Sequence, residues 1–359
     1  MRYQKLFVFV IILSMFLTCK NENPVETQIK TFDISKGFSF CDTITLSSIA
    51  DSVSWVILET TDQSLITQIS SIHIGKDIIV LWDDRRKKLM QFTRDGYFVN
   101  EIGRIGKGPG EFISLLSFAV DDEGQYIFIL ENGTQKILVY DFANNFQSSI
   151  KIDCYPSRMT FSSNHLILYS PRPTQSFNEG YAMSIYNTKE KTWKRIAKMP
   201  DENIGLQIPR FSNINRTSDG IRFWDCYSDT VYQIGPEFVI YPVFYLDYGS
   251  RRIPYDILKD KNQFSQKAFE FDLVVKLLDT EYLLFLDGLS KGARRRILFE
   301  KETGLSYHLT GPDGSSQIID DIDECYPFWP GGVINERNCF DVIEPIEVNI
   351  DYPITLRIH

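Results

Sequence analysis

Two short basic runs are the first residues of this sequence suited to hold a ligand. Arg85 and Arg86 begin one run, and Arg294 and Arg295 begin the other. Each run stands where a strand is expected to start after a turn. Guanidinium groups bind anions, so the runs predict a patch for an anionic glycan or for lipid phosphates. The alternative is a solvated hairpin rim.

An aromatic loop is the second candidate. Residues 325–332 read CYPFWPGG. Aromatic rings have a large apolar face and can stack on a sugar ring, which makes Tyr326, Phe328 and Trp329 candidate ligand contacts. The same rings could instead close the last part of the fold, and the sequence leaves both interpretations open.

The sequence holds no pattern typical of a catalytic or metal site. Its four His have no HxH or HExxH spacing, it has no GxSxG elbow, and paired acids such as Asp83-Asp84 lack the alternating ligands of a calcium loop. We therefore predict no catalytic residue, no metal and no cofactor, and interpret the paired acids as solvated turn residues. Residues 103–112, GRIGKGPGEF, lack the Ser or Thr that follows Gly-Lys in a phosphate-binding loop, so we interpret them as a turn.

Composition excludes one class of partner. The chain has 359 residues with 38 Lys and Arg against 47 Asp and Glu, a formal net charge of -9. Because an acidic surface repels phosphate backbones, we expect no nucleic-acid partner. Aromatic residues make up 14% of the chain, which favours strands because flat rings fit a pleated surface.

The N-terminus is typical of an export signal. Arg2 and Lys5 precede an apolar stretch over residues 6–17, which as a helix would span about 18 Å, against about 30 Å for a hydrocarbon core. A charged start and a short apolar core indicate a secretory signal peptide over residues 1–18. The end of the stretch is similar to a bacterial lipobox, which predicts lipidation at Cys19. A soluble secreted protein is the alternative.

The rest of the chain divides into a tether and one domain. Residues just after Cys19 are polar and without periodicity, so we predict a flexible tether over residues 19–37. Residues 38–359 are then a single folded domain.

Strand-like runs recur at a nearly constant interval within that domain. Ile79 and Ile127 are 48 positions apart, as are Phe92 and Tyr140. A repeat of this length with several short strands is typical of a propeller blade. The length from residue 53 to the end predicts an all-β fold, a six-bladed β-propeller of four-stranded antiparallel blades. A sandwich would not explain the constant spacing.

One segment interrupts the repeat. Leu258, Phe264, Phe269, Leu273 and Leu277 recur at roughly helical intervals. We predict a short helical insertion near residues 254–280, with an irregular loop as the alternative.

The ends of the domain are expected to meet. An unsealed ring leaves bare strand edges, and the sequence alternates apolar and polar residues at both ends. We predict that residues near 41–46 or 53–59 pair with the final blade.

Two segments carry a family resemblance. Residues 50–53, ADSV, and 58–61, LETT, resemble the opening of the six-bladed β-propeller lipoproteins of Bacteroidota. The glycines and Phe112 of residues 103–112 resemble the inter-blade turn of NHL-type propellers. The resemblance covers most of the mature chain through its spacing. It implies a radial six-bladed fold, export, lipid anchoring and no settled biochemical activity.

Three tripeptides resemble the O-glycosylation acceptor of Bacteroidota, in which Asp precedes Ser or Thr and an apolar residue. They predict acceptors at Thr43, Ser52 and Thr230.

These features favour an outer-membrane lipoprotein, facing the periplasm or exposed at the surface and anchored in the membrane by its lipid. We predict that its monomeric propeller binds a glycan, a peptide or a partner protein without catalysis. The alternative is an envelope lyase or hydrolase that acts on a carbohydrate or peptide at the central channel. An enzyme should gather titratable side chains around a real cavity.

Overall fold

A computed structural model describes residues 29–37, 43–131, 133–170, 178–198, 212–217, 220–226, 228–309, 317–323, 326–343 and 355–358. Contacts divide the chain into a unit of residues 1–30 and a unit of residues 31–359. The fold described below is that of the second unit. In the parts of the chain just given, no helix is both long and apolar enough to cross a membrane.

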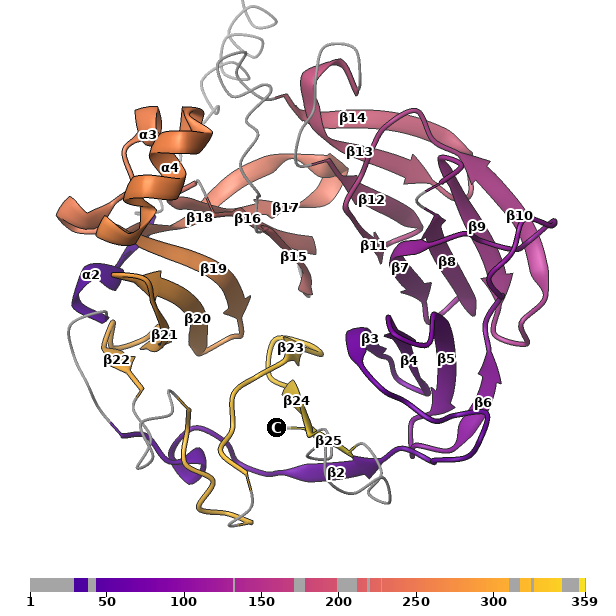
Figure 1. The fold of residues 1–359 in the computed structure, drawn as a ribbon, viewed down its shortest axis with the longest axis horizontal. Coiled ribbons are helices and arrows are strands. Elements are labelled where there is room, and N and C mark those ends of the chain that lie inside the picture. The colour runs from indigo at the N-terminus through magenta and orange to yellow at the C-terminus, as the bar shows by residue number, and fades with distance from the viewer. Residues whose placement is uncertain are drawn as a thin grey trace, which may run out of the picture. The chain divides into compact units, whose positions relative to one another are not determined.

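Antiparallel sheets surround a common axis, which makes the fold an all-β propeller (Figure 1). Three sheets are four-stranded meanders in which the chain runs outward from the axis. Their strands are β3 (Ile69–Ile74), β4 (Ile78–Asp83), β5 (Lys88–Thr93) and β6 (Phe98–Glu101); β7 (Leu115–Asp121), β8 (Tyr126–Glu131), β9 (Lys136–Asp141) and β10 (Phe146–Lys151); and β11 (Arg158–Ser162), β12 (His165–Tyr169), β13 (Tyr181–Asn187) and β14 (Thr192–Lys198).

Two of the three remaining sheets include a strand from the N-terminal part of the chain. A five-stranded sheet holds β15 (Ser212–Thr217), β16 (Gly220–Asp225), β17 (Thr230–Ile234), β18 (Ile240–Asp247) and, at its outer edge, β1 (Lys30–Asp33). A four-stranded sheet follows with β19 (Asp272–Asp279), β20 (Leu283–Ser290), β21 (Ala293–Glu300) and β22 (Ser306–His308). The last sheet holds β23 (Gly332–Val333), β24 (Cys339–Ile343), β25 (Thr355–Ile358) and β2 (Ser54–Ile57).

Two expectations about the ends of the domain can be judged. Strand β2 pairs with β25, with Val56 opposite Leu356, so the prediction that residues 53–59 join the final blade is confirmed. The prediction of six four-stranded blades is wrong as stated, because five described sheets have four strands and the other has five. The extra strand lies in residues 30–37, which were expected to be tether and instead form β1 and the helical turn α2 (Ile34–Gly37).

The core lies between neighbouring sheets. Strand β4 is buried along its whole length, as expected of an apolar run covered on both faces. Its two faces contribute to different clusters: Val80 and Trp82 pack towards the sheet of β7–β10, while Ile79 and Leu81 pack with Leu356. Burial of alternate side chains on opposite sides holds adjacent sheets together.

A buried acid, Asp83, holds the backbone just before β3 and just after β4. The carboxylate of Asp83, at the end of β4, accepts hydrogen bonds from the backbone N–H groups of Thr67 (2.6 Å), Arg85 (3.0 Å) and Arg86 (3.0 Å). Asp83 is fully buried, so its interpretation as a solvated turn acid is wrong. The carboxylate replaces water for three amides that the turn would otherwise leave unpaired.

The helical insertion is confirmed over part of its expected range. It lies between β18 and β19 and consists of α3 (Tyr255–Lys259) and α4 (Lys261–Lys267). Asp260 caps α4 by accepting hydrogen bonds from the N–H groups of Asn262 and Gln263. Residues 272–279 are strand β19 instead. Leu273 and Leu277 are both buried there and pack in the same core cluster, although the register of β19 shifts between Val274 and Lys276.

The turn at residues 103–112 connects the outer strand β6 to the inner strand β7 of the next sheet. Phe112 is buried and its ring lies 6.1 Å from that of Trp82, so it packs between two neighbouring sheets. Positive φ occurs at Gly103 (63°) and Gly110 (75°), positions where other residues would be strained.

Candidate functional site

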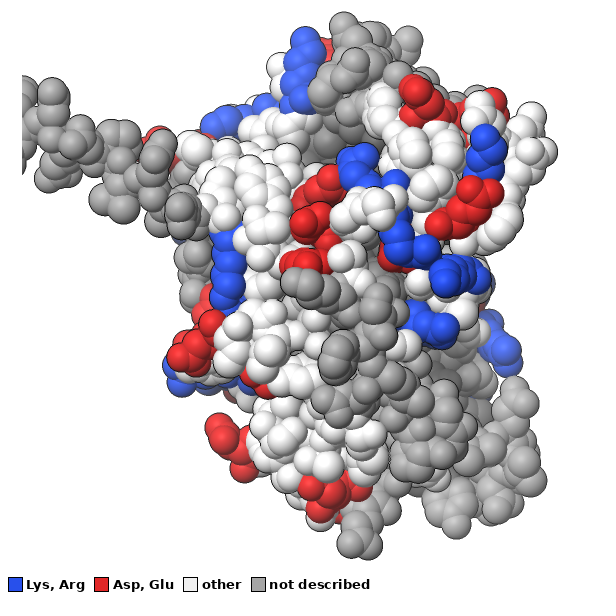
Figure 2. All heavy atoms as spheres, turned by 90° about the vertical axis from the view of Figure 1, so that its left-hand side faces the viewer, with Lys and Arg blue, Asp and Glu red and all other residues white. Residues whose placement is uncertain are grey.

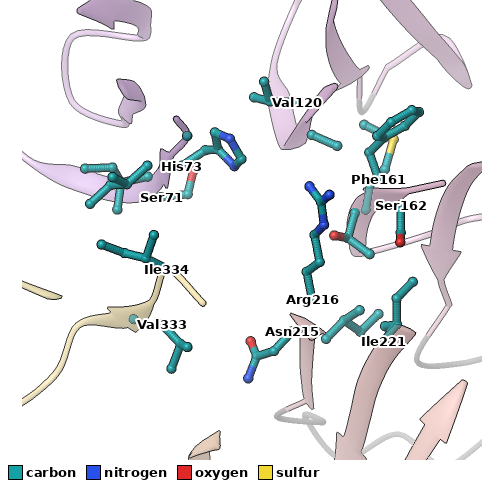
Figure 3. Close-up of a pocket in the computed structure, with 18 of the residues that line it drawn as sticks. Ser71, His73, Val120, Phe161, Ser162, Asn215, Arg216, Ile221, Val333 and Ile334 are labelled. Atoms are coloured by element: carbon teal, nitrogen blue, oxygen red, sulfur yellow. The ribbon is translucent and has the colours of Figure 1, made fainter. Parts of the chain in front are cut away.

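The candidate site is the cavity around the axis, with a volume of about 1950 Å³. Its wall consists mainly of the innermost strands β3, β7, β11, β15 and β23, with two residues of β19. These strands are hydrogen-bonded to a neighbour on their outer side within their sheets. Side chains from different blades therefore converge on one space (Figure 3).

Arg216 is a charged side chain of the cavity wall. It lies near the end of β15, opposite Ile221 of β16. Figure 3 shows its guanidinium directed into the cavity, between the side of His73 and the side of Ser162. Its side chain is exposed, and within the described residues we find no hydrogen bond or ion pair for its guanidinium.

His73 and Asp122 form a pair across two sheets. His73 lies on β3, Asp122 follows β7, and the imidazole Nε2 lies 3.1 Å from the nearer carboxylate oxygen. A Cβ atom on Gly75 would collide with that carboxylate, so a larger residue there would displace Asp122 from its place beside His73. The pairing orients the imidazole beside Ser71 on the cavity wall (Figure 3).

Lys276 is a cavity cation that the protein itself satisfies. Its ammonium donates to the carbonyl oxygens of Pro330 (3.2 Å) and Gly331 (2.7 Å). Burial lowers the pKa of Lys276, with the carboxylate of Asp287 acting in the opposite direction. Lys276 therefore joins β19 to the last sheet, whereas the guanidinium of Arg216 remains available to a ligand.

Hydroxyl and amide groups complete the polar part of the wall. They come from β3, β7, β11 and β15, and include Ser71, Ser117, Thr160, Ser162, Asn215 and Thr217. Apolar patches lie among them, with Val333 and Ile334 on the side of the last sheet (Figure 3). Such a wall can hydrogen-bond a polar ligand and pack against its apolar faces.

The basic runs predicted as a ligand patch lie on different sheets. Arg85 donates from Nε to the amide oxygen of Gln68 (3.0 Å), and Arg86 is half-buried beside it. Arg294 forms an ion pair with Asp287 (3.2 Å). Since the runs follow β4 and β20, they do not form one site.

Arg295 also bonds within the protein, because its guanidinium donates to the carbonyl of Arg294 (3.0 Å). Charges elsewhere on the surface are mixed as well. On the side that carries α3 and α4, Lys and Arg lie among Asp and Glu (Figure 2), in pairs such as Arg251–Asp272 and Arg252–Asp229.

Most of the aromatic loop belongs to the core. Phe328 is 1% exposed and Trp329 7%, and both pack in the cluster between the sheet of β19–β22 and the last sheet. They are unavailable to stack on a sugar, because their rings already contact Phe285 and its neighbours. This agrees with the interpretation that they close the fold. Tyr326 is 52% exposed.

The other predicted positions carry no ligand geometry. Thr43 and Ser52 are exposed, while Thr230 is half-buried at the start of β17. Cys19 lies outside the described residues. The O-glycosylation and lipidation sites therefore stay predictions.

The glycine-rich turn is occupied by its own carboxylate. Glu111 accepts hydrogen bonds from the N–H of Gly108 (2.7 Å) and from Nε of Arg104 (2.6 Å). These bonds, first that from Gly108, hold the pKa of Glu111 below its ordinary value. The turn thus binds an anion that the chain supplies, consistent with its structural interpretation.

Sequence reasoning missed the convergence of Arg216, His73 and Asp122. A polar pair, Asn215-Arg216, within an otherwise strand-like run is the one local signal. Because adjacent residues of a strand point to opposite faces, the pair indicates polar side chains on both faces but does not show that either face borders a cavity.

Comparison with known proteins defines the family and the fold. A family model described as a domain of unknown function, DUF4934, matches residues 29–350. The match is to this family and not to NHL-type propellers, so the NHL-type resemblance stays a prediction. None of the curated proteins matches the chain.

Solved structures share the fold at low sequence identity. A Bacteroides fragilis protein, provisionally described as exported, is 18% identical, with a TM-score of 0.66 over 89% of this chain and 98% of that chain. A member of the DUF4221 family from Bacteroides vulgatus is 9% identical, with a TM-score of 0.50 over 74% of this chain and 84% of the other. At these identities the likeness concerns the fold alone.

Proposed function

Because the chain belongs to the DUF4934 family, whose description names no activity, we propose a function from the cavity: a non-enzymatic binding or scaffold module for a glycan, a peptide or a partner protein. The observation that carries the proposal is a cavity of about 1950 Å³ that holds Arg216 without a partner among the described residues. A group kept unpaired in a concave, mixed wall is suited to a ligand.

In this proposal the five-stranded sheet serves as the sixth blade of a closed ring. The core clusters support it, because each joins two neighbouring sheets, including the first and the last. A closed ring gives a rigid frame, and rigid frames suit binding because little order is lost when the ligand arrives.

Arrays of glycans and of peptides test the binding role. The Cys19→Ser form is used, since it leaves every described residue unchanged. We expect saturable binding to members of one class and a rise in melting temperature with that ligand, because a ligand that binds only the folded state stabilises it. Absence of array binding and of any ligand-dependent melting shift would contradict a glycan or peptide ligand and leave only a partner protein.

We further propose that the protein is exported and held at the outer membrane by lipid on Cys19. The apolar stretch before Cys19 is short, and the Bacteroides fragilis protein of the same fold is provisionally described as exported. We expect wild-type protein in the membrane fraction and the Cys19→Ser variant in the soluble fraction. Equal membrane retention of the two forms would refute the anchor.

One observation favours a second candidate, the envelope lyase or hydrolase. The His73–Asp122 pair on the cavity wall holds an imidazole in the orientation that a general base requires. Mass spectrometry of the ligand after incubation decides between the two. Cleavage by wild type that is lost in His73→Gln supports the enzyme, and an intact ligand supports the binding module.

A further inference from the structure

We propose that the cavity takes an oligosaccharide in which some sugars carry a carboxylate, and that Arg216 pairs with one such carboxylate. This inference rests on the proposed binding function and names its ligand class. Three features of the cavity lead to it: the unpaired cation, the hydroxyl-rich wall and the volume.

The cation requires an anionic group. Among the other basic side chains of the cavity wall, Lys276 bonds to two carbonyls and Arg158 donates to the carbonyl of Ser157 (3.3 Å), while Lys76 and Arg94 add further positive charge. Arg216 has none among the described residues, although the chain has an excess of acids, with a net charge of -9. A guanidinium presents a planar fork of donors that matches the two oxygens of a carboxylate.

The wall favours a sugar over a peptide as the carrier of that carboxylate. Ser71, Thr160 and Ser162 provide hydroxyls, which both donate and accept hydrogen bonds. Sugar hydroxyls have the same double capacity, so each can be matched in either direction. Val333 and Ile334 add apolar surface that can cover the C–H face of a sugar ring.

Charge and volume limit the ligand further. Asp122 and Glu237 line the cavity together with basic residues such as Lys76. This mixed wall suits an oligosaccharide in which neutral sugars separate the acidic ones. Pockets for single small molecules occupy about 300–1000 Å³, whereas this cavity has about 1950 Å³. The space suits several sugar units in a row.

The test is a glycan array that contains uronic-acid oligosaccharides and neutral oligosaccharides of the same length. The Cys19→Ser form is compared with the same form carrying Arg216→Met, Arg216→Lys or Arg85→Met. Arg85 is the matched control, because it is exposed, lies outside the cavity and belongs to the basic run first predicted as a ligand patch.

We expect binding to the acidic members only. Arg216→Met should weaken it at least about tenfold, as expected for the loss of a charge-assisted hydrogen bond, and Arg216→Lys should keep part of it. Arg85→Met should bind as the parent does. The affinity should also fall as salt rises, since salt screens a charge pair that water can reach. Melting temperatures of the Arg216 variants should equal that of the parent, because Arg216 has no described partner to lose.

Two results would overturn the inference and leave the binding function intact. One is binding to neutral oligosaccharides or to peptides alone. The other is acidic binding that Arg216→Met does not weaken, or that Arg85→Met weakens instead. Absence of binding to every glycan and peptide would refute the inference together with the glycan and peptide parts of the proposed function.

Discussion

Replacing Phe32 by Ala tests whether the N-terminal strand β1 is part of the propeller. Phe32 is 3% exposed and packs in the cluster between the five-stranded sheet and the sheet of β19–β22. Its ring meets Phe244 edge-on at 5.2 Å and Phe299 at 5.8 Å. Residues 19–37 were expected to be a flexible tether. If Phe32 were part of a tether, its replacement would leave the free energy of unfolding unchanged, whereas loss of a packed Phe32 should lower it.

The expected loss of stability is large. Truncation of a buried Phe to Ala costs about 3–5 kcal/mol, which already includes the edge-to-face contacts of about 0.5–1.5 kcal/mol each. For a domain of this size, about 2 °C of melting temperature corresponds to 1 kcal/mol. Phe32→Ala should therefore lower the melting temperature by about 6–10 °C.

Thermal melts followed by circular dichroism measure this in the Cys19→Ser form. Thr31→Ala is the matched control, because Thr31 is the neighbouring residue of β1 and its side chain is exposed. The control should melt within about 1 °C of the parent, as surface substitutions usually do. Equal melting temperatures for Phe32→Ala and Thr31→Ala would refute the packing of β1 and support the prediction of a flexible tether.

Two further predictions concern the turn at residues 103–112. Gly110→Ala should destabilise by more than about 1 kcal/mol, because Gly110 has a φ of 75° and a Cβ atom there would lie 2.8 Å from the ring of Phe146. Gly108→Ala should cost less in the same urea titration, since the nearest atom belongs to the flexible side chain of Glu111; an equal cost for both variants would contradict this. Hydrogen bonds from the Gly108 N–H and from Arg104 hold the pKa of Glu111 below its ordinary 4.5. Ionised Glu111 therefore contributes stability in full above about pH 4.5 and loses it as the pH falls through the lower folded pKa. Parent and Glu111→Gln should differ in melting temperature at pH 6 and converge towards pH 3, and a gap that is constant with pH would argue against the role of the charge.

The sequence by itself determined the repeat and the inter-blade turn. The 48-residue spacing places Ile79 and Ile127 at equivalent positions of β4 and β8, and Phe92 and Tyr140 at equivalent positions of β5 and β9. These features are readable because in four of the sheets each strand pairs only with its neighbours in the chain. The signals of such a sheet, alternation and turn residues, therefore stay within one repeat.

Only the tertiary structure decided what distant segments do to one another. Strand β1 joins a sheet whose other strands begin at residue 212, and local alternation cannot specify a partner that far along the chain. The ring of Phe328 is buried where the sequence allowed an exposed platform, because burial depends on which sheet closes over a loop.

The candidate site was also decided by the tertiary structure alone. Alternation along β3 and β15 shows that Ser71 and His73 share one face and that Arg216 has a polar neighbour. It does not show that these faces border one cavity, or that Asp122 of the next sheet reaches His73. The inner strands approach one another only when the sheets close around the axis, so the cavity is a property of the closed ring and of no single repeat.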